Sequence, residues 1–231
     1  MKTMGLIGGM SWESTQVYYR LINQRVRDEL GGLHSARIVL FSVDFAEIEV
    51  LQQQGAWSTA AEILGSAARA VESAGAEFLL LCTNTMHKVA SEVEHEVSIP
   101  LLHIADATAN ALKRDGITCV GLVGTRFTME QEFYLGRLQD HGIRVVVPDE
   151  PQREHVHSVI FTELCRGVVK SDSKAAYLDV VASLAERGAQ GVILGCTEIG
   201  LLIQGSDTEV RLYDTTDIHA EQAVQHALGR T

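Results

Sequence analysis

The sequence of 231 residues predicts an α/β fold made of two related halves, each a parallel sheet covered by helices. Two observations lead to this prediction. Short β-branched or leucine-rich runs alternate with longer segments of helical periodicity, which is the pattern of strands joined by crossover helices. Two pairs of segments also repeat along the chain at nearly equal spacing. We therefore expect two pseudo-symmetric, Rossmann-like αβα domains with the active site in the cleft between them.

Short apolar runs mark the expected strands of the first half, and helices fill most of the intervals between them. The first strand is the apolar run that ends in Gly8, the second is rich in Ile, Val, Leu and Phe, and the third reads Phe-Leu-Leu-Leu-Cys. The fourth strand is a short apolar run just before residue 105. The expected strands are Thr3–Gly8, Ala36–Val43, Glu77–Cys82 and Leu101–Ile104.

The second half repeats this alternation. Its runs are again short and rich in Val, Ile and Leu, with segments of helical periodicity between them. The expected strands are Thr118–Val123, Arg144–Val147, Gly191–Leu194 and Val210–Tyr213.

An internal repeat supports the division into halves. Gly75–Thr83 can be aligned with Gly188–Cys196 at an offset of 113 residues, and Gly5–Gly8 with Gly121–Gly124 at an offset of 116. Two matches at similar offset indicate a duplication. Each half then has roughly 110 residues, a normal size for a small domain. We expect a boundary near 105–116, with domains 1–104 plus a C-terminal helix at about 216–231, and 105–215.

Composition narrows the class of protein. Hydrophobic residues make up 46% of the chain and charged residues 21%, and only three prolines occur, so a globular chain is expected. The net charge of −11, with no cluster of Lys and Arg, argues against nucleic acid as a partner. The start of the chain does not read as a signal peptide and no run is long enough to span a membrane, so we expect a cytoplasmic protein. The four cysteines are expected to be free thiols.

Three expected strands run directly into small or polar residues. These segments are Gly8-Gly9-Met10-Ser11, Cys82-Thr83-Asn84-Thr85 and Gly195-Cys196-Thr197-Glu198. In open parallel sheets, ligands bind beyond the carboxyl ends of the strands. If the two halves face each other, Thr83 lies opposite Cys196 across the cleft.

Cys196 lies between an apolar strand and an expected helix start, where exposed N–H groups and the helix dipole favour a thiolate. The alternative is a buried and inert cysteine. Thr83, Thr85 and Asn84 have an ordinary alternative as helix caps and a turn residue. The repeat sets Thr83 and Asn84 against Cys196 and Thr197, so these hydroxyl and amide groups are candidates for binding a carboxylate.

The remaining polar candidates carry less specific signals. Gly8-Gly9-Met10-Ser11 matches no nucleotide-binding motif, but its N–H groups offer a site for a small carboxylate, with Met10 lining the pocket. His155 and His157 lie in an expected helix, where residues two apart do not share a face, so we predict no metal site there. His87 is either a proton or hydrogen-bond donor or a capping residue.

Three ordered motifs resemble the aspartate/glutamate racemase family. They are Gly8-Gly9-Met10-Ser11-Trp12-Glu13-Ser14-Thr15, Asn84-Thr85-Met86-His87 and Gly195-Cys196-Thr197-Glu198. The resemblance implies an isomerase that works without pyridoxal phosphate or another cofactor, a small amino acid substrate, and a homodimer. It also implies two cysteines that remove and return the α-proton from opposite faces, which explains the use of two mirrored halves.

The chain departs from this pattern at Thr83, where the family has a cysteine. A hydroxyl is a far weaker acid than a thiol, so we expect Cys196 to deprotonate one enantiomer, the L form, while Thr83 relays a proton to the other face. Cys82 is next to this position, but strand alternation points it to the opposite face, and we expect it in the core. Turnover is then expected to be unequal for the two enantiomers.

Family resemblance also supplies the substrate contacts. The segment Asp44–Trp57, a substrate loop in the family, contains Gln52 but no Lys or Arg to bind a side-chain carboxylate. Thr125 and Thr128 resemble a Thr-x-x-Thr element that holds one carboxylate, and Arg126 adds charge there. The expected substrate-binding residues are Met10, Gln52, Asn84, Thr85, Thr125, Thr128, Thr197 and Glu198.

Other functions stay open on the sequence alone. The same superfamily includes hydantoin racemases, maleate isomerases and arylmalonate decarboxylases, and the last of these use a single cysteine in the second half. A broad-specificity amino acid racemase is a further alternative. A different class is a non-catalytic amino acid-binding protein, in which the loss of the first cysteine marks a dead enzyme. Activity on free amino acids distinguishes an amino acid racemase from the other superfamily enzymes and from a binding protein.

Overall fold

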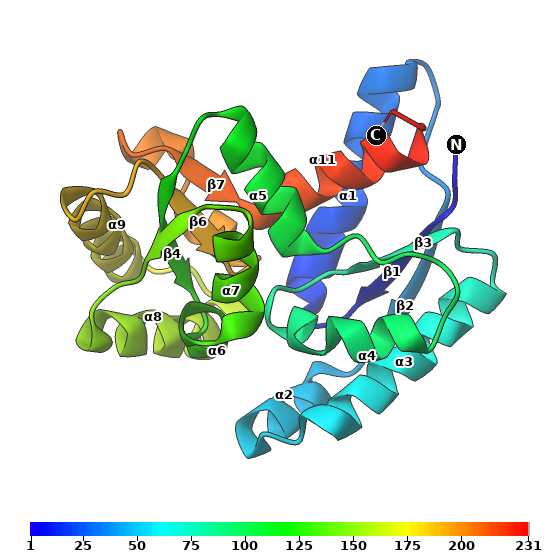
Figure 1. Cartoon of the computed structure of the whole chain (residues 1–231), viewed down its shortest axis with the longest axis horizontal. Helices are drawn as coiled ribbons and strands as arrows, with labels where there is room; N and C mark the ends of the chain where they lie inside the picture. The colour runs from blue at the N-terminus through cyan, green and yellow to red at the C-terminus, as the bar shows by residue number, and fades with distance from the viewer. Residues whose placement is uncertain (231) are drawn as a thin grey trace. The chain divides into compact units, whose positions relative to one another are not determined.

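The computed structural model describes residues 1–230 and confirms the predicted α/β class (Figure 1). Within these residues the strands form a three-stranded sheet with the order β2-β1-β3 and a four-stranded sheet with the order β5-β4-β6-β7. Every neighbouring pair of strands in both sheets is parallel.

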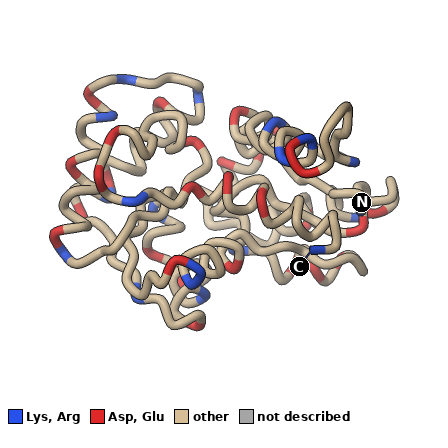
Figure 2. The backbone as a smooth tube through the Cα atoms, turned by 90° about the horizontal axis from the view of Figure 1, so that it is seen from above, with Lys and Arg blue, Asp and Glu red and all other residues tan. Residues whose placement is uncertain are grey.

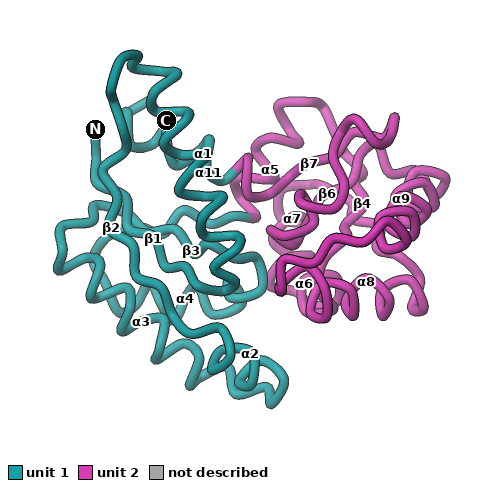
Figure 3. The backbone as a smooth tube through the Cα atoms, turned by 180° about the vertical axis from the view of Figure 1, so that it is seen from behind, with its two compact units in different colours: residues 1–104, 219–231 teal, residues 105–218 magenta. Residues whose placement is uncertain are grey.

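The described chain divides into two compact units, coloured separately in Figure 3. Unit 1 comprises Met1–Ile104 together with the residues from His219 onward, and unit 2 comprises Ala105–Ile218. The chain therefore leaves unit 1 after Ile104 and returns to it at His219.

Unit 1 has helices on both faces of its sheet. Its strands are β1 (Met4–Gly8), β2 (Ile38–Ser42) and β3 (Phe78–Leu81). Because side chains alternate along a strand, Leu6, Leu80 and Cys82 lie in one apolar cluster, whereas Ile7 and Leu81 lie in another. The first cluster includes residues of α1 (Trp12–Leu30) and α11 (Thr215–Ala227). The second includes residues of α2 (Phe45–Gln54), α3 (Trp57–Ser73), η1 (Thr85–Val89) and α4 (Ala90–His95).

The strand expected at Leu101–Ile104 is wrong. In this segment only Leu101 pairs with a strand, through an isolated parallel bridge to Leu79. The N–H of Leu79 donates to Pro100 O, and the carbonyl of Leu79 accepts from Leu102 N. The chain cannot extend further because helix α5 (Ile104–Arg114) already begins at Ile104.

Unit 2 repeats the arrangement around β4. Its strands are β4 (Cys119–Gly124), β5 (Arg144–Val146), β6 (Val192–Gly195) and β7 (Leu212–Asp214). Helix α9 (Ser171–Glu186) packs against β4 and β6, and α7 (Glu132–Asp140) packs against β5. The other helices are α6 (Arg126–Glu130), α8 (Glu150–Thr162), η2 (Leu164–Arg166), α10 (Ile199–Leu202) and η3 (Gly205–Asp207).

The repeated segments of the sequence form equivalent strands. β1 and β4 each lie inside their sheet, and β3 and β6 each pair with that inner strand. Both polar segments of the repeat therefore follow a buried strand at the carboxyl end of a parallel sheet.

The surface and the helices give three further observations. Lys and Arg positions are interspersed with Asp and Glu positions along the chain (Figure 2). β2 is an edge strand, and its side chains Leu40 and Phe41 are 44% and 41% exposed. None of the helices in residues 1–230 has the length and apolar character needed to cross a membrane.

Candidate active site

The turn after β1 is held by backbone geometry and by Thr15. Gly9 has φ = 90°, and a Cβ at this position would lie 2.2 Å from Val43 O, so only glycine fits. Gly9 N donates to Thr15 Oγ1 at 2.8 Å, and Thr15 Oγ1 donates to Ser11 O at 2.9 Å. Ser11 occupies the expected N-cap position of α1, although its side chain makes no capping hydrogen bond. Met10 is buried among the apolar side chains of unit 1.

The three polar residues after β3 are all buried. Thr83, Asn84 and Thr85 have exposures of 7%, 2% and 6%, and Thr85 begins η1. Cys82 lies fully buried in the apolar cluster against α1 and α11, as strand alternation predicts. Burial raises the pKa of the Cys82 thiol, which suits a core residue and not a proton carrier.

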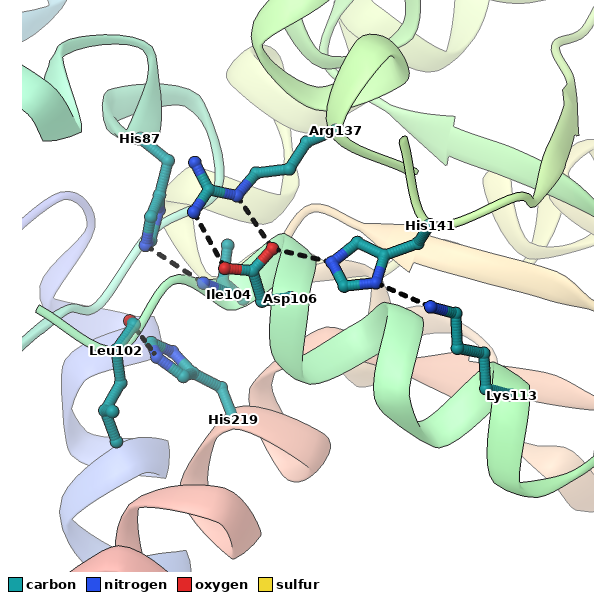
Figure 4. Close-up of polar contacts among 8 residues, drawn as sticks. All are labelled: His87, Leu102, Ile104, Asp106, Lys113, Arg137, His141 and His219. Carbon is teal, nitrogen blue, oxygen red and sulfur yellow. Dashed lines mark hydrogen bonds and ion pairs between the residues drawn. The ribbon is translucent and has the colours of Figure 1, made fainter. Parts of the chain in front are cut away.

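His87 connects this turn to the start of α5. Its Nδ1 lies 2.8 Å from Thr83 O, and its Nε2 accepts the hydrogen bond of Ile104 N at 3.2 Å (Figure 4). The ring is buried. The imidazole therefore bonds to the backbone at two places, at Thr83 just before η1 and at Ile104 at the start of α5.

Gln52 reaches η1 from the end of α2. Its Nε2 donates to Met86 Sδ at 3.1 Å, and both side chains are buried. The ammonium of Lys88, the next residue but one, lies 4.8 Å from the ring centroid of Trp57 at the start of α3. These two contacts connect η1 to residues 44–57, the segment that we expected to bind substrate. The contact from Lys88 also places a positive charge beside this segment.

In unit 2, Thr125 and Thr128 bind each other. Thr125 is the N-cap of α6 and accepts from Thr128 N at 3.3 Å, and the two hydroxyl oxygens are 3.2 Å apart. Arg126 N donates to His157 Nδ1 at 3.2 Å. His157 thus supports this turn, in agreement with its predicted place in a helix. Burial is the main cause that lowers the pKa of His157, and the charge of Arg126 adds to it.

Cys196 follows β6 in a buried turn. Its Sγ donates to Glu198 Oε2 at 3.0 Å, and Thr197 Oγ1 donates to the same oxygen at 2.8 Å. All three side chains are less than 9% exposed. A Cβ on Gly195 would lie 3.3 Å from Thr128 Cγ2, so the Thr125–Thr128 turn lies beside the start of this segment.

Two features of the structure oppose the thiolate that the position of Cys196 in the sequence favours. Burial and then the negative charge of Glu198 raise the pKa of the thiol well above its usual value. The following helix α10 has only four residues, so it offers little dipole to oppose these effects. These effects favour the protonated thiol, which donates its hydrogen bond to the Glu198 carboxylate.

Sequence reasoning missed two further polar side chains of unit 2, Cys165 and Asp214. Cys165 in η2 is close enough to interact electrostatically with Cys196, and burial raises its own pKa. Asp214, at the end of β7, accepts from Thr216 N at 2.8 Å and Asp217 N at 3.3 Å. The position of Asp214 at a strand end was the available signal, whereas nothing in the sequence around Cys165 indicated its location.

Within residues 1–230, no group of three or more His, Cys, Asp or Glu side chains is arranged to hold a metal ion. Unit 1 places hydroxyl and amide side chains after β3, and unit 2 places hydroxyl, thiol and carboxyl side chains after β4 and β6. The selected residues fall into two sets, listed here by unit: Met10, Gln52, Thr83, Asn84 and Thr85 in unit 1, and Thr125, Thr128, Cys196, Thr197 and Glu198 in unit 2.

A family model described as Asp/Glu/Hydantoin racemase matches residues 7–223. The chain belongs to this racemase family. The match includes both units and all the selected residues.

Three relatives of this racemase-family chain are described as racemases or as a racemase homologue. A solved structure from Yersinia pestis assigned to the Asp/Glu racemases is 56% identical, with a TM-score of 0.91, and the match covers 99% of this chain and 100% of that one. An aspartate racemase homologue from Pyrococcus horikoshii OT3 is 35% identical, with a TM-score of 0.85 and the same coverage. The broad specificity amino-acid racemase RacX of Bacillus subtilis (strain 168) is 23% identical over 159 residues, which cover 69% of this chain and 68% of the relative.

Proposed function

We propose that this protein is a cofactor-independent amino acid racemase that acts on aspartate, glutamate or both by removing and returning the α-proton. Cys196 is the base, and Thr83 acts in place of the usual second cysteine. The observation that carries the proposal is the 3.0 Å hydrogen bond from the Cys196 thiol to Glu198 Oε2.

Glu198 gives the resting thiol a route to the thiolate. In the first step the thiol proton passes to Glu198 Oε2, and the S–H bond breaks. The thiolate then removes the α-proton from the substrate, and the electron pair of the C–H bond delocalises into the α-carboxyl group. Burial of Cys196 and Glu198 keeps water from competing for these protons.

Thr83 completes inversion by supplying a proton to the other face of Cα and regaining one from solvent. Glu198 loses to solvent the proton that it took from the thiol, so all three side chains return to their resting state. A hydroxyl is too weak an acid to provide a resting alkoxide base, so we expect a lower kcat for the reverse reaction. Because the two enantiomers are equally stable in solution, kcat/KM is the same in both directions, and KM for the D enantiomer is lower in proportion. In this proposal both half-sites serve one substrate. The hydroxyl and amide groups of Asn84, Thr85, Thr125, Thr128 and Thr197, together with Met10 and Gln52, bind it.

The preference for an acidic substrate is the finer part of the proposal. The segment 44–57 has no Lys or Arg of its own, but Lys88 places an ammonium group over Trp57 within that segment. This cation supports binding of a side-chain carboxylate. A broad-specificity racemase, as RacX is described, is the alternative if neutral amino acids react equally fast.

The decisive experiment follows α-proton exchange in D₂O by NMR, with L-Asp, D-Asp, L-Glu and D-Glu measured separately. We expect exchange with inversion, faster from the L enantiomers, and a loss of about 10²- to 10⁴-fold in Cys196→Ser, the range for one acid/base group. Cys119→Ser is the matched control. The enantiomers are compared at saturating substrate, and an equal kcat for both, or full activity in Cys196→Ser, would contradict the proposal.

An absence of exchange from all four amino acids would favour other functions. Decarboxylation of a substituted malonate would then indicate a single-cysteine decarboxylase, whereas tight amino acid binding without exchange would indicate a binding protein.

We also propose that the protein is a cytoplasmic homodimer. Its cysteines Cys82, Cys119, Cys165 and Cys196 are all free, which fits a reducing compartment. The dimer is supported by the family resemblance and by the exposed apolar side chains of the edge strand β2. Cell fractionation that finds the protein in an oxidising compartment would contradict the proposed location.

A further inference from the structure

Two buried histidines of unit 1 contact the segment through which the chain leaves that unit. His87 accepts from Ile104 N, and His219 Nε2 lies 2.8 Å from Leu102 O (Figure 4). Both rings are at most 2% exposed, and their centroids are 5.9 Å apart. The segment Leu102–Ile104 is therefore bound by imidazole groups at two of its backbone atoms.

The partners of His87 determine its tautomer. A backbone amide can only donate, so Nε2 of His87 must carry a lone pair toward Ile104 N. A carbonyl oxygen can only accept, so Nδ1 must carry a hydrogen toward Thr83 O, 2.8 Å away. His87 is therefore the neutral Nδ1–H form. It cannot donate from Nε2 or gain a proton there without losing the bond to Ile104.

His219 has the opposite tautomer. Its Nε2 donates to Leu102 O, and its Nδ1 accepts from Tyr18 Oη at 2.9 Å. Burial lowers the pKa of His219 to about 4, so it is neutral at physiological pH. His219 is also the residue at which the chain returns to unit 1.

Ile104 is the first residue of α5, where backbone amides lack a partner within the helix. His87 supplies the acceptor for this amide while its other nitrogen holds the carbonyl of Thr83. One rigid ring thus sets the separation between the candidate proton relay and the first turn of the helix that leads into unit 2.

We propose that His87 is a positioning residue: as the neutral Nδ1–H imidazole, it fixes the Thr83 turn to the first amide of α5, and His219 holds the carbonyl of Leu102 in the same segment. The part of this inference that treats Thr83 as a proton relay rests on the proposed function. The ring itself does not transfer a proton in the reaction.

The tautomers can be measured directly. We expect ¹⁵N–¹H correlation spectra of the labelled full-length protein to show hydrogen on Nδ1 of His87 and on Nε2 of His219. An Nε2–H form at His87 would overturn the proposal. This measurement needs no variant and no activity, so it remains decisive if a substitution prevents folding or if the protein has no racemase activity.

Two substitutions separate the two hydrogen bonds. In His87→Gln, Oε1 can accept from Ile104 N but the bond to Thr83 O is lost, whereas in His87→Asn, Nδ2 can donate to Thr83 O but the acceptor for Ile104 is lost. We expect amide exchange of Ile104 to be about tenfold faster in His87→Asn and unchanged in His87→Gln, since one net hydrogen bond corresponds to about that factor. We expect kcat to fall about tenfold in His87→Gln, with KM changed less than about threefold, and to stay within about threefold of wild type in His87→Asn.

His95 provides the matched control, because its Nδ1 also contacts the carbonyl four residues earlier, at Ser91, but its side chain is exposed. His95→Asn and His95→Gln should change neither readout. If His87→Asn leaves the amide exchange of Ile104 unchanged, the proposed positioning role of His87 is wrong. If the wild-type protein shows the predicted tautomers but no α-proton exchange, the proposed function fails and the positioning role of His87 is retained.

Discussion

The thiol of Cys196 and the carboxylate of Glu198 meet in a buried turn, and each changes what the other can do. The carboxylate raises the pKa of the thiol, after burial itself, because a second negative charge nearby is unfavourable. The same carboxylate accepts the hydrogen bond of the thiol and is the nearest place for its proton. Glu198 therefore disfavours the resting thiolate while providing the proton acceptor that the proposed chemistry requires.

Glu198→Gln separates these two effects. We expect the alkylation of Cys196 by iodoacetamide to reach its midpoint at a pH at least about 1 unit lower, because the nearby negative charge is gone. We also expect α-proton exchange to fall by about 10²-fold, because Gln cannot take the proton. Mass spectrometry of the Cys196 peptide distinguishes this thiol from Cys165. Exposed Glu209→Gln is the control, and undiminished exchange in Glu198→Gln would exclude Glu198 as the proton acceptor.

Strand β2 is an edge strand of its sheet, and all five of its residues are at least partly exposed. Arg37 O accepts from Met4 N and Val43 N donates to Gly8 O, so odd-numbered residues direct their backbone groups to β1. The backbone groups of Ile38, Leu40 and Ser42 therefore face outward. A two-fold axis through this edge would let them pair with the same residues of a second copy in an antiparallel arrangement.

We expect sedimentation velocity to show a dimer for the wild-type protein and monomers for Leu40→Lys, since a charge on an edge strand opposes pairing. Leu33→Lys is the control, because Leu33 is fully exposed in a loop outside the strand. A wild-type monomer would contradict the proposed homodimer. A Leu40→Lys dimer would show that β2 is not its interface.

For the whole molecule, buried neutral histidine links folding to pH. Burial lowers the pKa of His219 from an ordinary value near 6.5 to about 4, although its bond to Leu102 O acts in the opposite direction. The unfolded chain then binds more protons between these two values. The free energy of unfolding therefore falls as pH decreases from about 6.5 to about 4, and the loss is complete below about 4.

This depression of the pKa corresponds to roughly 3 kcal/mol of unfolding free energy between pH 7 and pH 4. We expect urea unfolding to show a pH dependence over this range that is smaller by about that amount in His219→Gln than in wild type. Tyr18 and His87 face the same ring, so both must be kept unchanged in the comparison. Exposed His34→Gln is the control, and an unchanged pH dependence in His219→Gln would refute this assignment.

The sequence by itself determined the α/β class, most strands and the polar segments at their ends. Periodicity and short apolar runs depend only on neighbouring residues, and the internal repeat needs only the comparison of two segments of the sequence. The burial of Cys82 followed in the same way from strand alternation. The failed strand at Leu101–Ile104 shows the limit of such signals, since a helix start at Ile104 interrupts an apolar run that looks extended.

Only the tertiary structure decided the chemical state of the candidate groups. Burial and the charge of Glu198 favour the protonated thiol of Cys196. The dipole of the following helix α10 opposes them only weakly, because that helix has only four residues. His87 and His219 are neutral in opposite tautomers because of partners up to 201 residues away in sequence, such as Tyr18 for His219. Protonation depends on desolvation and on the atoms that each group meets, and residues distant in the chain supply those atoms only after folding.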